Sequence, residues 1–305
     1  MSKPTTQATD YYTEAFSRNI GLLTVAEQER LRRACVAIPG MGGAGGVAAA
    51  TLARTGIGRF RIADFDEFDV VNMNRQYGAT VHTLGRNKAE VMAEVITSIN
   101  PEAEVAVFTE AITEDNVDEF LAGADVVQDA LDYFVPDARR LLYRHARARG
   151  LHVVAAGPLG FSSAMLVFSP TGMSFDEYFD IRDDMSFEEK LIAFSIGVAP
   201  GGTHLAYIDP KSVDFKKGYG PSLGLACQLA SGMAAAEIVN ILLKRRPVRA
   251  APHYSQFDPY TMQYKTGMLW WGNRNPIQRL KRWYVKRLLL KGERLRSLSA
   301  EQRGA

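Results

Sequence analysis

Cysteine is scarce in this sequence: only Cys35 and Cys227 occur, and they lie far apart in the chain. Two isolated cysteines make neither a disulfide framework nor the CxxC pairs that hold structural zinc, so we expect no zinc site. The sequence also has no run of about 18 apolar residues, the length that a membrane span needs. Its polar first residues, 1–9, lack the apolar core of a signal peptide. We therefore expect a cytoplasmic protein without a membrane-spanning segment.

Acidic residues are nearly missing from the C-terminal part of the chain. Residues 244–305 contain 15 of the 36 Lys and Arg residues but only 3 of the 34 Asp and Glu residues. Residues 1–243 carry the opposite excess, so a basic tail follows an acidic body. This distribution predicts either that the tail binds an anionic partner or that it folds back onto the body, and charge alone favours neither.

What the sequence does contain is a regular alternation of short apolar runs and longer helical segments. Strands are expected at residues 34–39, 59–65, 104–108, 125–130, 151–155 and 164–168. Helices are expected at residues 11–33, 47–55, 87–99, 116–122, 137–149, 223–243 and 276–291. This alternation predicts an α/β fold with a doubly wound, Rossmann-like, mainly parallel sheet. Residues 172–220 show little periodicity and are expected to form a long crossover loop.

A glycine-rich turn joins the first expected strand to the helix that follows it. Its glycines Gly40, Gly42 and Gly45 fit the pattern G-x-G-x-x-G. One glycine permits the tight turn, one lets the backbone approach a phosphate, and one lets the helix pack closely on the strand. The helix N-terminus then offers free N–H groups to an anion. Asp64 and Asp66 end the next strand, where a carboxylate binds ribose hydroxyls, so we expect a nucleotide at this turn.

Two cations distinguish between the nucleotides that such a turn could hold. Arg75 follows the second strand, and Lys88 begins the next helix. A dinucleotide needs neither, whereas the charge of a triphosphate must be neutralised before its α-phosphorus is attacked. Asp132 follows the fourth strand, at the sheet edge where ligand groups gather, and a carboxylate there can hold Mg²⁺ against phosphates. The pattern therefore favours ATP with Mg²⁺.

The order and spacing of these motifs resemble the ThiF/MoeB/HesA family of adenylating enzymes, bacterial relatives of ubiquitin-activating enzymes. The matching pieces within about residues 18–160 are GMGGAG, the DFD that ends the second strand, N-x-N-R-Q, the lysine of GRNKAE and the last aspartate of DALD. The stretch from LARTGIG to NMNRQ most resembles the branch that contains the tRNA threonylcarbamoyladenosine dehydratase. Tyr133 departs from the family, which often has Asn after the Mg²⁺ aspartate.

The resemblance implies an ATP and Mg²⁺ site and a homodimer. The implied ATP-binding residues are Gly40, Gly42, Gly43, Gly45, Asp64, Asp66, Asn72, Arg75 and Lys88. Asp132 is the implied Mg²⁺ ligand, and Arg18 is the arginine that one protomer lends to the ATP site of the other.

The expected activity is ATP-dependent adenylation of a substrate carboxylate with release of pyrophosphate. Neither cysteine occupies the loop where thioester-forming relatives carry theirs, so the chemistry is expected to proceed without a cysteine thioester. The carboxylate could belong to a ubiquitin-like protein, a peptide, a small metabolite or a modified tRNA. Two alternatives stay open: an NAD-dependent oxidoreductase, and a non-catalytic nucleotide-binding scaffold.

The expected organisation is one adenylating domain, residues 1–269, followed by a basic amphipathic tail, residues 270–305. The domain is divided into a helical arm at 10–33, a nucleotide-binding core at 34–160 and a substrate-facing region at 161–269. Aromatic residues among the cations at 270–296 suit an anionic membrane surface or RNA. Membrane contact would make the protein peripheral, whereas the alternative is a helix docked on the acidic body with its apolar face inward.

Overall fold

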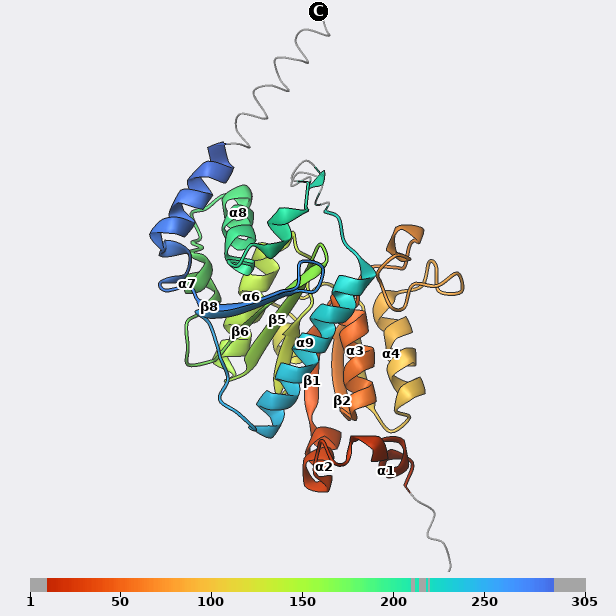
Figure 1. Ribbon diagram of the computed structural model, residues 1–305. Helices are drawn as coiled ribbons and strands as arrows, with labels where there is room; N and C mark the ends of the chain where they lie inside the picture. The colour runs from red at the N-terminus through yellow and green to blue at the C-terminus, as the bar shows by residue number, and fades with distance from the viewer. Residues whose placement is uncertain (1–9, 210–211, 214–217, 219, 288–305) are drawn as a thin grey trace, which may run out of the picture.

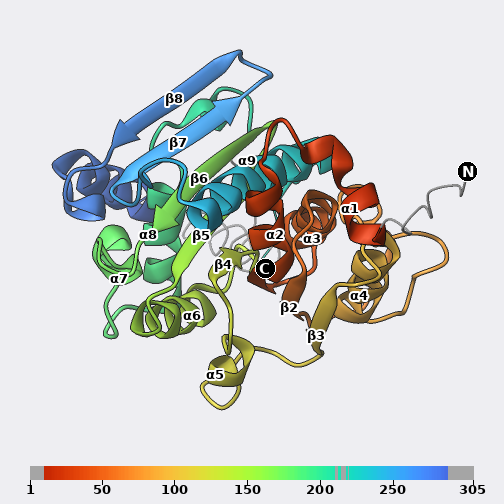
Figure 2. The same cartoon turned by 90° about the horizontal axis from the view of Figure 1, so that it is seen from below.

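One eight-stranded sheet organises the molecule, in the order β3-β2-β1-β4-β5-β6-β7-β8 (Figures 1 and 2). The computed structural model describes residues 10–209, 212–213, 218 and 220–287. The strands are β1 Cys35–Pro39, β2 Arg59–Ala63, β3 Glu104–Phe108, β4 Val126–Asp129, β5 His152–Leu159, β6 Ser162–Phe168, β7 His253–Asp258 and β8 Gln263–Met268. Strands β3, β2, β1, β4 and β5 pair in parallel, and β5 to β8 pair antiparallel. The predicted doubly wound, mainly parallel α/β sheet is confirmed.

Helices cover both faces of the sheet (Figure 2). One face carries α3 Gly43–Thr55, α4 Lys88–Ile99 and α9 Gly224–Leu243. The other carries α5 Val117–Phe120, α6 Pro136–Ala148, α7 Phe175–Phe179 and α8 Phe187–Val198. Because side chains alternate along a strand, Val36 and Ile38 enter the first core and Ala37 the second.

Helix α9 is, by length and composition, apolar enough to cross a membrane. It packs against α3, β5 and β6, and residues such as Ala230, Ala234 and Ile238 are fully buried there. A helix that is apolar on most faces belongs either in a membrane or in a protein core. The contacts of α9 therefore identify it as a core helix.

The segment between β6 and α9 is not the structureless loop expected at 172–220. It contains α7, α8 and the 3-10 helix η3 Thr203–Ala206. Helices α7 and α8 each start at a capping box, in which Ser174 and Ser186 exchange hydrogen bonds with the residue three positions on. Their buried aromatic side chains, including Phe179 and Phe194, fill the second core beside β6. The prediction was wrong because tertiary packing stabilises helices too short for a clear periodic signal.

The N-terminal arm is also more broken than the single helix expected at 11–33. It comprises α1 Tyr11–Ala15, η1 Ser17–Asn19 and α2 Val25–Arg33. Gly21 adopts a φ of 109°, which interrupts the helix, and Thr24 starts α2 with its own capping box. The arm lies at the amino ends of the strands, at the bottom of Figure 1.

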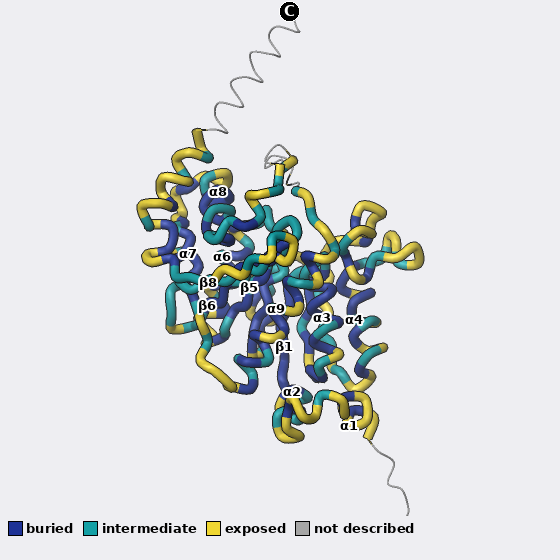
Figure 3. The backbone as a smooth tube through the Cα atoms, viewed as in Figure 1, coloured by how far each residue is buried: buried dark blue, intermediate teal, exposed yellow. Residues whose placement is uncertain are grey.

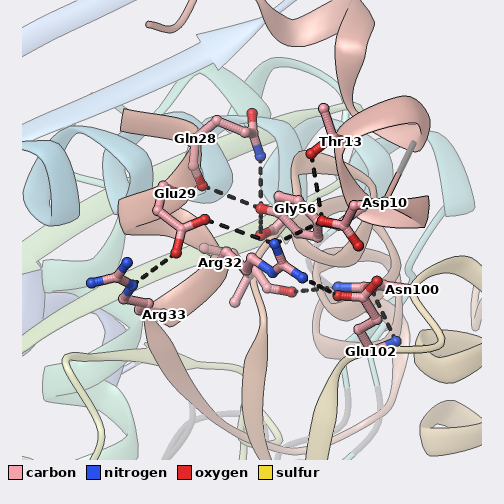
Figure 4. Close-up of polar contacts among 11 residues, drawn as sticks. Asp10, Thr13, Gln28, Glu29, Arg32, Arg33, Gly56, Asn100 and Glu102 are labelled. Carbon is pink, nitrogen blue, oxygen red and sulfur yellow. Dashed lines mark hydrogen bonds and ion pairs between the residues drawn. The ribbon is translucent and has the colours of Figure 1, made fainter. Parts of the chain in front are cut away.

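Arg32 fixes this arm to the sheet (Figure 4). Its guanidinium contacts the carboxylates of Asp10 at 2.9 Å and Glu102 at 2.5 Å, with Glu29 at 3.9 Å. It also lies over the ring of Tyr12, 4.6 Å from the centroid. Both terminal nitrogens of this guanidinium therefore have acidic partners within the protein.

The basic C-terminal helix docks on the body, but in the orientation opposite to the docked alternative. Its described part, residues 276–287, packs beside α7 and α8 (Figure 1). Gln278 is buried, while Ile277, Leu280 and Tyr284 are exposed. The helix therefore presents polar groups inward and its apolar face outward, so the expectation of an inward apolar face was wrong. The rest of the expected tail, residues 288–305, lies outside the described residues.

Candidate nucleotide-binding site

The glycine loop lies at the carboxyl end of β1, pressed against the end of β4. Gly40 has a φ of 94°, and a Cβ atom at this position would stand 2.2 Å from the carbonyl oxygen of Ala130. A Cβ at Gly45 would stand 1.7 Å from the carbonyl oxygen of Gly40. Gly42 is the N-cap of α3, and no side chain caps this helix. The first turn of α3 thus has backbone N–H groups available to an anion.

Asp64 lies directly beneath this loop, at the end of β2. One of its oxygens accepts a hydrogen bond from the Met41 N–H at 2.7 Å, and the other accepts one from the Asp66 N–H at 2.9 Å. Burial raises the pKa of the Asp64 carboxyl above its ordinary value, although these two hydrogen bonds oppose the shift. The carboxylate is therefore held in place by the backbone, with lone pairs left for a ligand hydroxyl.

Lys88 and Asp66 form an ion pair at the first turn of α4. The Lys88 ammonium lies 3.0 Å from the Asp66 carboxylate, and the lysine side chain is only 7% exposed against 53% for the aspartate. Asn87 caps α4 and also donates to the Asp64 carbonyl oxygen at 3.0 Å. Lys88 is thus a buried cation whose acidic partner is solvent-accessible, so an incoming phosphate would compete with Asp66 for it.

Arg75 differs from Lys88 because it pairs with no carboxylate in the described chain. Its guanidinium donates to the Val71 carbonyl oxygen and to the Asn74 side-chain oxygen, both at 3.0 Å. Its aliphatic stem approaches the glycine loop, 3.6 Å from the point where a Gly43 Cβ would stand. The positive charge of Arg75 is therefore not neutralised within the described residues, beside a helix N-terminus that also attracts anions.

Asn72 and Gln76 lie in the same N-x-N-R-Q segment, and both are buried. The Asn72 side-chain oxygen accepts the Asp69 N–H at 3.0 Å and so shapes the 3-10 turn η2 Val70–Asn72. Gln76 packs against Gly42, and its buried side-chain oxygen has no hydrogen-bond partner in the structure. A buried acceptor without a donor is costly, so its position beside the glycine loop fits a site that a ligand completes.

Asp132 is exposed, on the loop that follows β4. One oxygen accepts the Phe134 N–H at 2.8 Å. The loop is held from below by Arg139, which donates to the Asp132 carbonyl oxygen at 2.7 Å and to the Leu131 carbonyl oxygen at 2.6 Å. Arg139 is itself fixed by a buried ion pair with Asp129 at 2.8 Å.

Sequence analysis missed the Asp129–Arg139 pair as a support of the site. Asp129 is the first aspartate of the DALD motif, and Arg139 lies in α6. Tyr143, one turn further along α6, also donates to the Asp129 carboxylate at 2.9 Å. No signal in the sequence singled out Arg139, because only the structure shows that this arginine is buried.

Tyr133, which departs from the family pattern, lies on the loop held by Arg139, which donates to its carbonyl oxygen at 3.4 Å. Its ring lies against Phe194 of α8, with centroids 5.2 Å apart. Burial raises the pKa of its hydroxyl. Tyr133 therefore links the Asp132 loop to the crossover segment.

Both cysteines are buried. Cys227, in the first turn of α9, lies beside the glycine loop, with its sulfur 2.7 Å from the point where a Gly43 Cβ would stand. Burial raises the pKa of the thiols of Cys227 and Cys35. A raised pKa keeps a thiol protonated and unreactive, so both cysteines act as small packing residues.

The structure brings together all the predicted site residues except Arg18. Arg18 is exposed on η1, at the amino ends of the strands and so at the opposite end of the molecule from the glycine loop (Figure 1). It makes no hydrogen bond or ion pair with the described part of the chain. Within one protomer it cannot reach the site.

Comparisons with known proteins show which family the chain resembles. The model of the ThiF family matches residues 16–276. The tRNA threonylcarbamoyladenosine dehydratase of Escherichia coli is 41% identical over 126 residues, which are 41% of this chain and 46% of the relative. The sulfur carrier protein ThiS adenylyltransferase of Escherichia coli is 30% identical over 157 residues, 51% of this chain and 62% of the relative. The chain thus matches only about half the length of these curated relatives.

Among solved structures, Escherichia coli MccB with ATP superposes with a TM-score of 0.63 at 17% identity, covering 87% of this chain and 72% of that one. An identity this low compares the folds alone. The family match, in contrast, includes the glycine loop and every charged residue placed around it. The chain therefore belongs to the ThiF family.

Proposed function

We propose that this protein is an adenylyltransferase that uses ATP to activate a substrate carboxylate as an acyl-adenylate. One observation carries the proposal: an uncapped helix N-terminus and the unneutralised guanidinium of Arg75 lie side by side at the glycine loop. Together they form a site for a polyanion. The family match and the adenylyltransferase named among the relatives support the same reaction.

The position of each residue suggests its role in this reaction. Arg75, Lys88 and the N–H groups of α3 would hold the phosphates, and Asp64 would accept from a ribose hydroxyl. Asp132 would hold Mg²⁺, which supplies further neutralisation of phosphate charge. An oxygen of the substrate carboxylate bonds to the α-phosphorus, and the bond to the pyrophosphate leaving group breaks. Positioning and charge neutralisation suffice for such a step, so no protein nucleophile is needed.

We further propose that the acyl group leaves the enzyme without passing through a cysteine thioester. Cys35 and Cys227 are the only cysteines of the chain, and both are buried thiols of raised pKa. An attacking thiolate needs a lowered pKa and access to its substrate. An external nucleophile would therefore accept the acyl group directly from the adenylate.

The carboxylate is proposed to belong to one of the classes that the resemblance implies: a ubiquitin-like protein, a peptide, a small metabolite or a modified tRNA. Helix α8 of the crossover segment contacts the loop that carries Asp132, because Tyr133 packs on Phe194. Its position fits a cover for the bound acyl substrate.

Pyrophosphate exchange into ATP, measured with one candidate carboxylate of each class, tests the reaction. The wild-type protein should exchange only with its own class of substrate. Arg75→Ala and Asp132→Asn should remove that exchange without changing the melting temperature. Arg32→Ala is the matched control, because it removes an arginine at the opposite sheet edge. Exchange retained in both site variants would place the chemistry elsewhere.

We also propose a homodimer in which Arg18 completes the site of the partner protomer. An exposed arginine without a partner in the described chain supports this assignment. Mixing Arg18→Ala with Asp132→Asn protein tests it, because each mixed dimer regains one intact site. By the symmetry of such a dimer, an equimolar mixture should recover about a quarter of wild-type activity. No recovery after subunit exchange, or full activity of Arg18→Ala alone, would contradict a shared site.

A further inference from the structure

The C-terminal helix is attached to the body through a row of polar side chains. Asn273 is fully buried and donates to the carbonyl oxygens of Phe179 at 2.9 Å and Ala193 at 2.7 Å. Gln278 donates to the Ile196 carbonyl oxygen at 3.1 Å. These bonds reach backbone carbonyl groups of α7 and α8, so they set the position of the helix.

Two ion pairs continue the same row. Arg282 contacts Asp180 at 2.6 Å, and Lys286 contacts Glu189 at 2.8 Å. Gln278, Arg282 and Lys286 are spaced by four residues, which places them on one face of a helix. The inward face is therefore mainly polar, with the half-buried Val285 as its apolar member, whereas an ordinary surface helix turns its apolar stripe to the core.

Six large apolar side chains in residues 270–287 are more than half exposed. The exposed residues are Trp270 62%, Trp271 64%, Ile277 66%, Leu280 64%, Trp283 55% and Tyr284 56%. We call these six residues the tail patch. In Figure 3 most residues of the C-terminal helix, at the upper left, are coloured as exposed. Clusters of exposed aromatic and aliphatic groups mark an interaction surface.

Cations surround the tail patch. Residues 270–287 contain six Lys and Arg residues and no Asp or Glu. Two of the six are neutralised by Asp180 and Glu189. The other four, Arg274, Arg279, Lys281 and Arg287, form no ion pair with the described chain, and Arg287 lies 5.2 Å from the ring centre of Trp283. The patch is thus apolar at its centre and positively charged around it.

We propose that the tail patch binds an anionic lipid surface. Such a surface offers both an apolar interior for Ile277 and Leu280 and negative charge for the four free cations, while Trp and Tyr favour the boundary between them. A second copy of the chain fits poorly, because it would bring the four unneutralised cations of one patch against the same four of the other. RNA would use the cations and the rings, but it gives no reason for two exposed aliphatic residues in the middle of the patch.

The lipid surface would also lie near the proposed site. The tail helix and the carboxyl ends of the parallel strands are at the same end of the molecule, opposite the N-terminal arm (Figure 1). A protein bound through the tail patch would therefore present its adenylation site toward the membrane rather than away from it.

The tryptophans give a local readout, because all three of the chain belong to the tail patch. Full-length protein is titrated with vesicles of phosphatidylcholine containing phosphatidylserine, with pure phosphatidylcholine vesicles, and with tRNA. We expect a blue shift of tryptophan emission and co-sedimentation with the anionic vesicles alone. Binding should weaken as salt rises, because the Debye length falls from about 10 Å at 0.1 M to about 3 Å at 1 M.

Two double variants separate the contributions of charge and apolar surface. Arg279→Gln/Lys281→Gln should weaken vesicle binding by at least about tenfold, because each cation near an anionic membrane contributes about 1 kcal/mol. Ile277→Ser/Leu280→Ser keeps the charge and should weaken binding by a similar factor. Leu22→Ser/Val25→Ser is the matched control, since both residues are strongly exposed in the arm at the other end. Melting temperatures verify that each variant is folded.

The proposal is overturned if anionic vesicles leave the emission unchanged, or if Ile277→Ser/Leu280→Ser binds them as wild type does. A spectral change with tRNA alone would identify the patch as an RNA surface instead. None of these variants touches the proposed ATP site, so pyrophosphate exchange should stay at the wild-type level in all of them. Failure of the membrane proposal and failure of the proposed function are therefore distinguishable.

Discussion

Arg32 lies at the amino ends of the strands and Arg75 at their carboxyl ends. The two arginines differ in whether the protein neutralises their charge. At the amino edge, Arg32 is surrounded by three carboxylates and a tyrosine ring (Figure 4). At the carboxyl edge, Arg75 contacts only neutral oxygens, beside a helix N-terminus without a cap. A charge neutralised within the protein stabilises the fold, whereas one left without a counter-charge can be neutralised by a ligand. On the proposed function, this difference separates the end of the sheet that stabilises the fold from the end that binds the ligand.

The strongest test of this comparison uses two glycines, Gly40 at the carboxyl ends of the strands and Gly21 at their amino ends. Gly40 and Gly21 both have positive φ, 94° and 109°. A Cβ at Gly40 meets a carbonyl oxygen at 2.2 Å, whereas one at Gly21 meets nothing within 4 Å. Gly21→Ala should cost only the conformational term, about 1–2 kcal/mol, and keep ATP binding. Gly40→Ala should cost more and abolish ATP binding. Thermal melts and calorimetry measure both, and equal behaviour of the two variants would contradict a constrained loop.

The buried pair Asp129–Arg139 should give the next largest effect. Arg139→Met leaves the Asp129 carboxylate buried without its cation, which typically costs about 3–5 kcal/mol of stability. The same change frees the loop that carries Asp132, because Arg139 holds two of its carbonyl oxygens. Urea unfolding should report the lost stability. The double variant Asp129→Leu/Arg139→Met should recover part of it, and an unchanged single variant would show that the pair supports nothing.

Substituting alanine for Arg75 and, separately, for Arg32 compares what each arginine contributes to ATP affinity and to stability. Arg75→Ala should weaken ATP binding about tenfold to a hundredfold, the loss of a charge-assisted contact worth about 1.5–3 kcal/mol, with little change in melting temperature. Arg32→Ala should do the reverse: a lower melting temperature and unchanged ATP affinity. A stability loss from Arg75→Ala, with ATP affinity preserved, would mean that both edges are structural.

Asp64 should make a smaller contribution to the stability of the fold, and this contribution should depend on pH. Burial raises the pKa of this carboxyl in the folded protein above its ordinary value of 3.8. The folded state therefore holds a proton that the unfolded chain has already released, and stability falls as pH rises from the ordinary value through the raised one. Asp64→Asn should remove this part of the pH dependence. Melting temperatures of the two proteins across the acidic range measure it, and parallel curves would show that Asp64 does not titrate in this way.

Most of the site was predictable from sequence because its residues stand in fixed relation to strand ends. The glycine loop, Asp64 and Asp132 each follow a recognisable apolar run, and parallel strands bring their carboxyl ends together. Gln76 was not recognised as a buried acceptor, because nothing in the sequence shows which polar side chains face inward. The role of Arg139 needed the structure for the same reason.

Other parts of the fold were less predictable for specific physical reasons. Strand β8 is an edge strand with exposed residues such as Tyr264, so it lacks an alternating apolar pattern. Helix α7 has five residues and is held by packing, but its capping box at Ser174 was readable. The C-terminal helix showed its apolar stripe in the sequence. The burial of Gln278 alone reveals that this stripe faces outward.

The central claim is that the glycine-loop edge binds ATP, and calorimetry with ATP·Mg²⁺ and with NAD tests it most directly. Wild-type protein and Arg32→Ala should bind ATP·Mg²⁺ with equal affinity, Arg75→Ala should bind it weakly, and none should bind NAD tightly. Tight NAD binding without ATP binding would contradict the account and restore the oxidoreductase alternative.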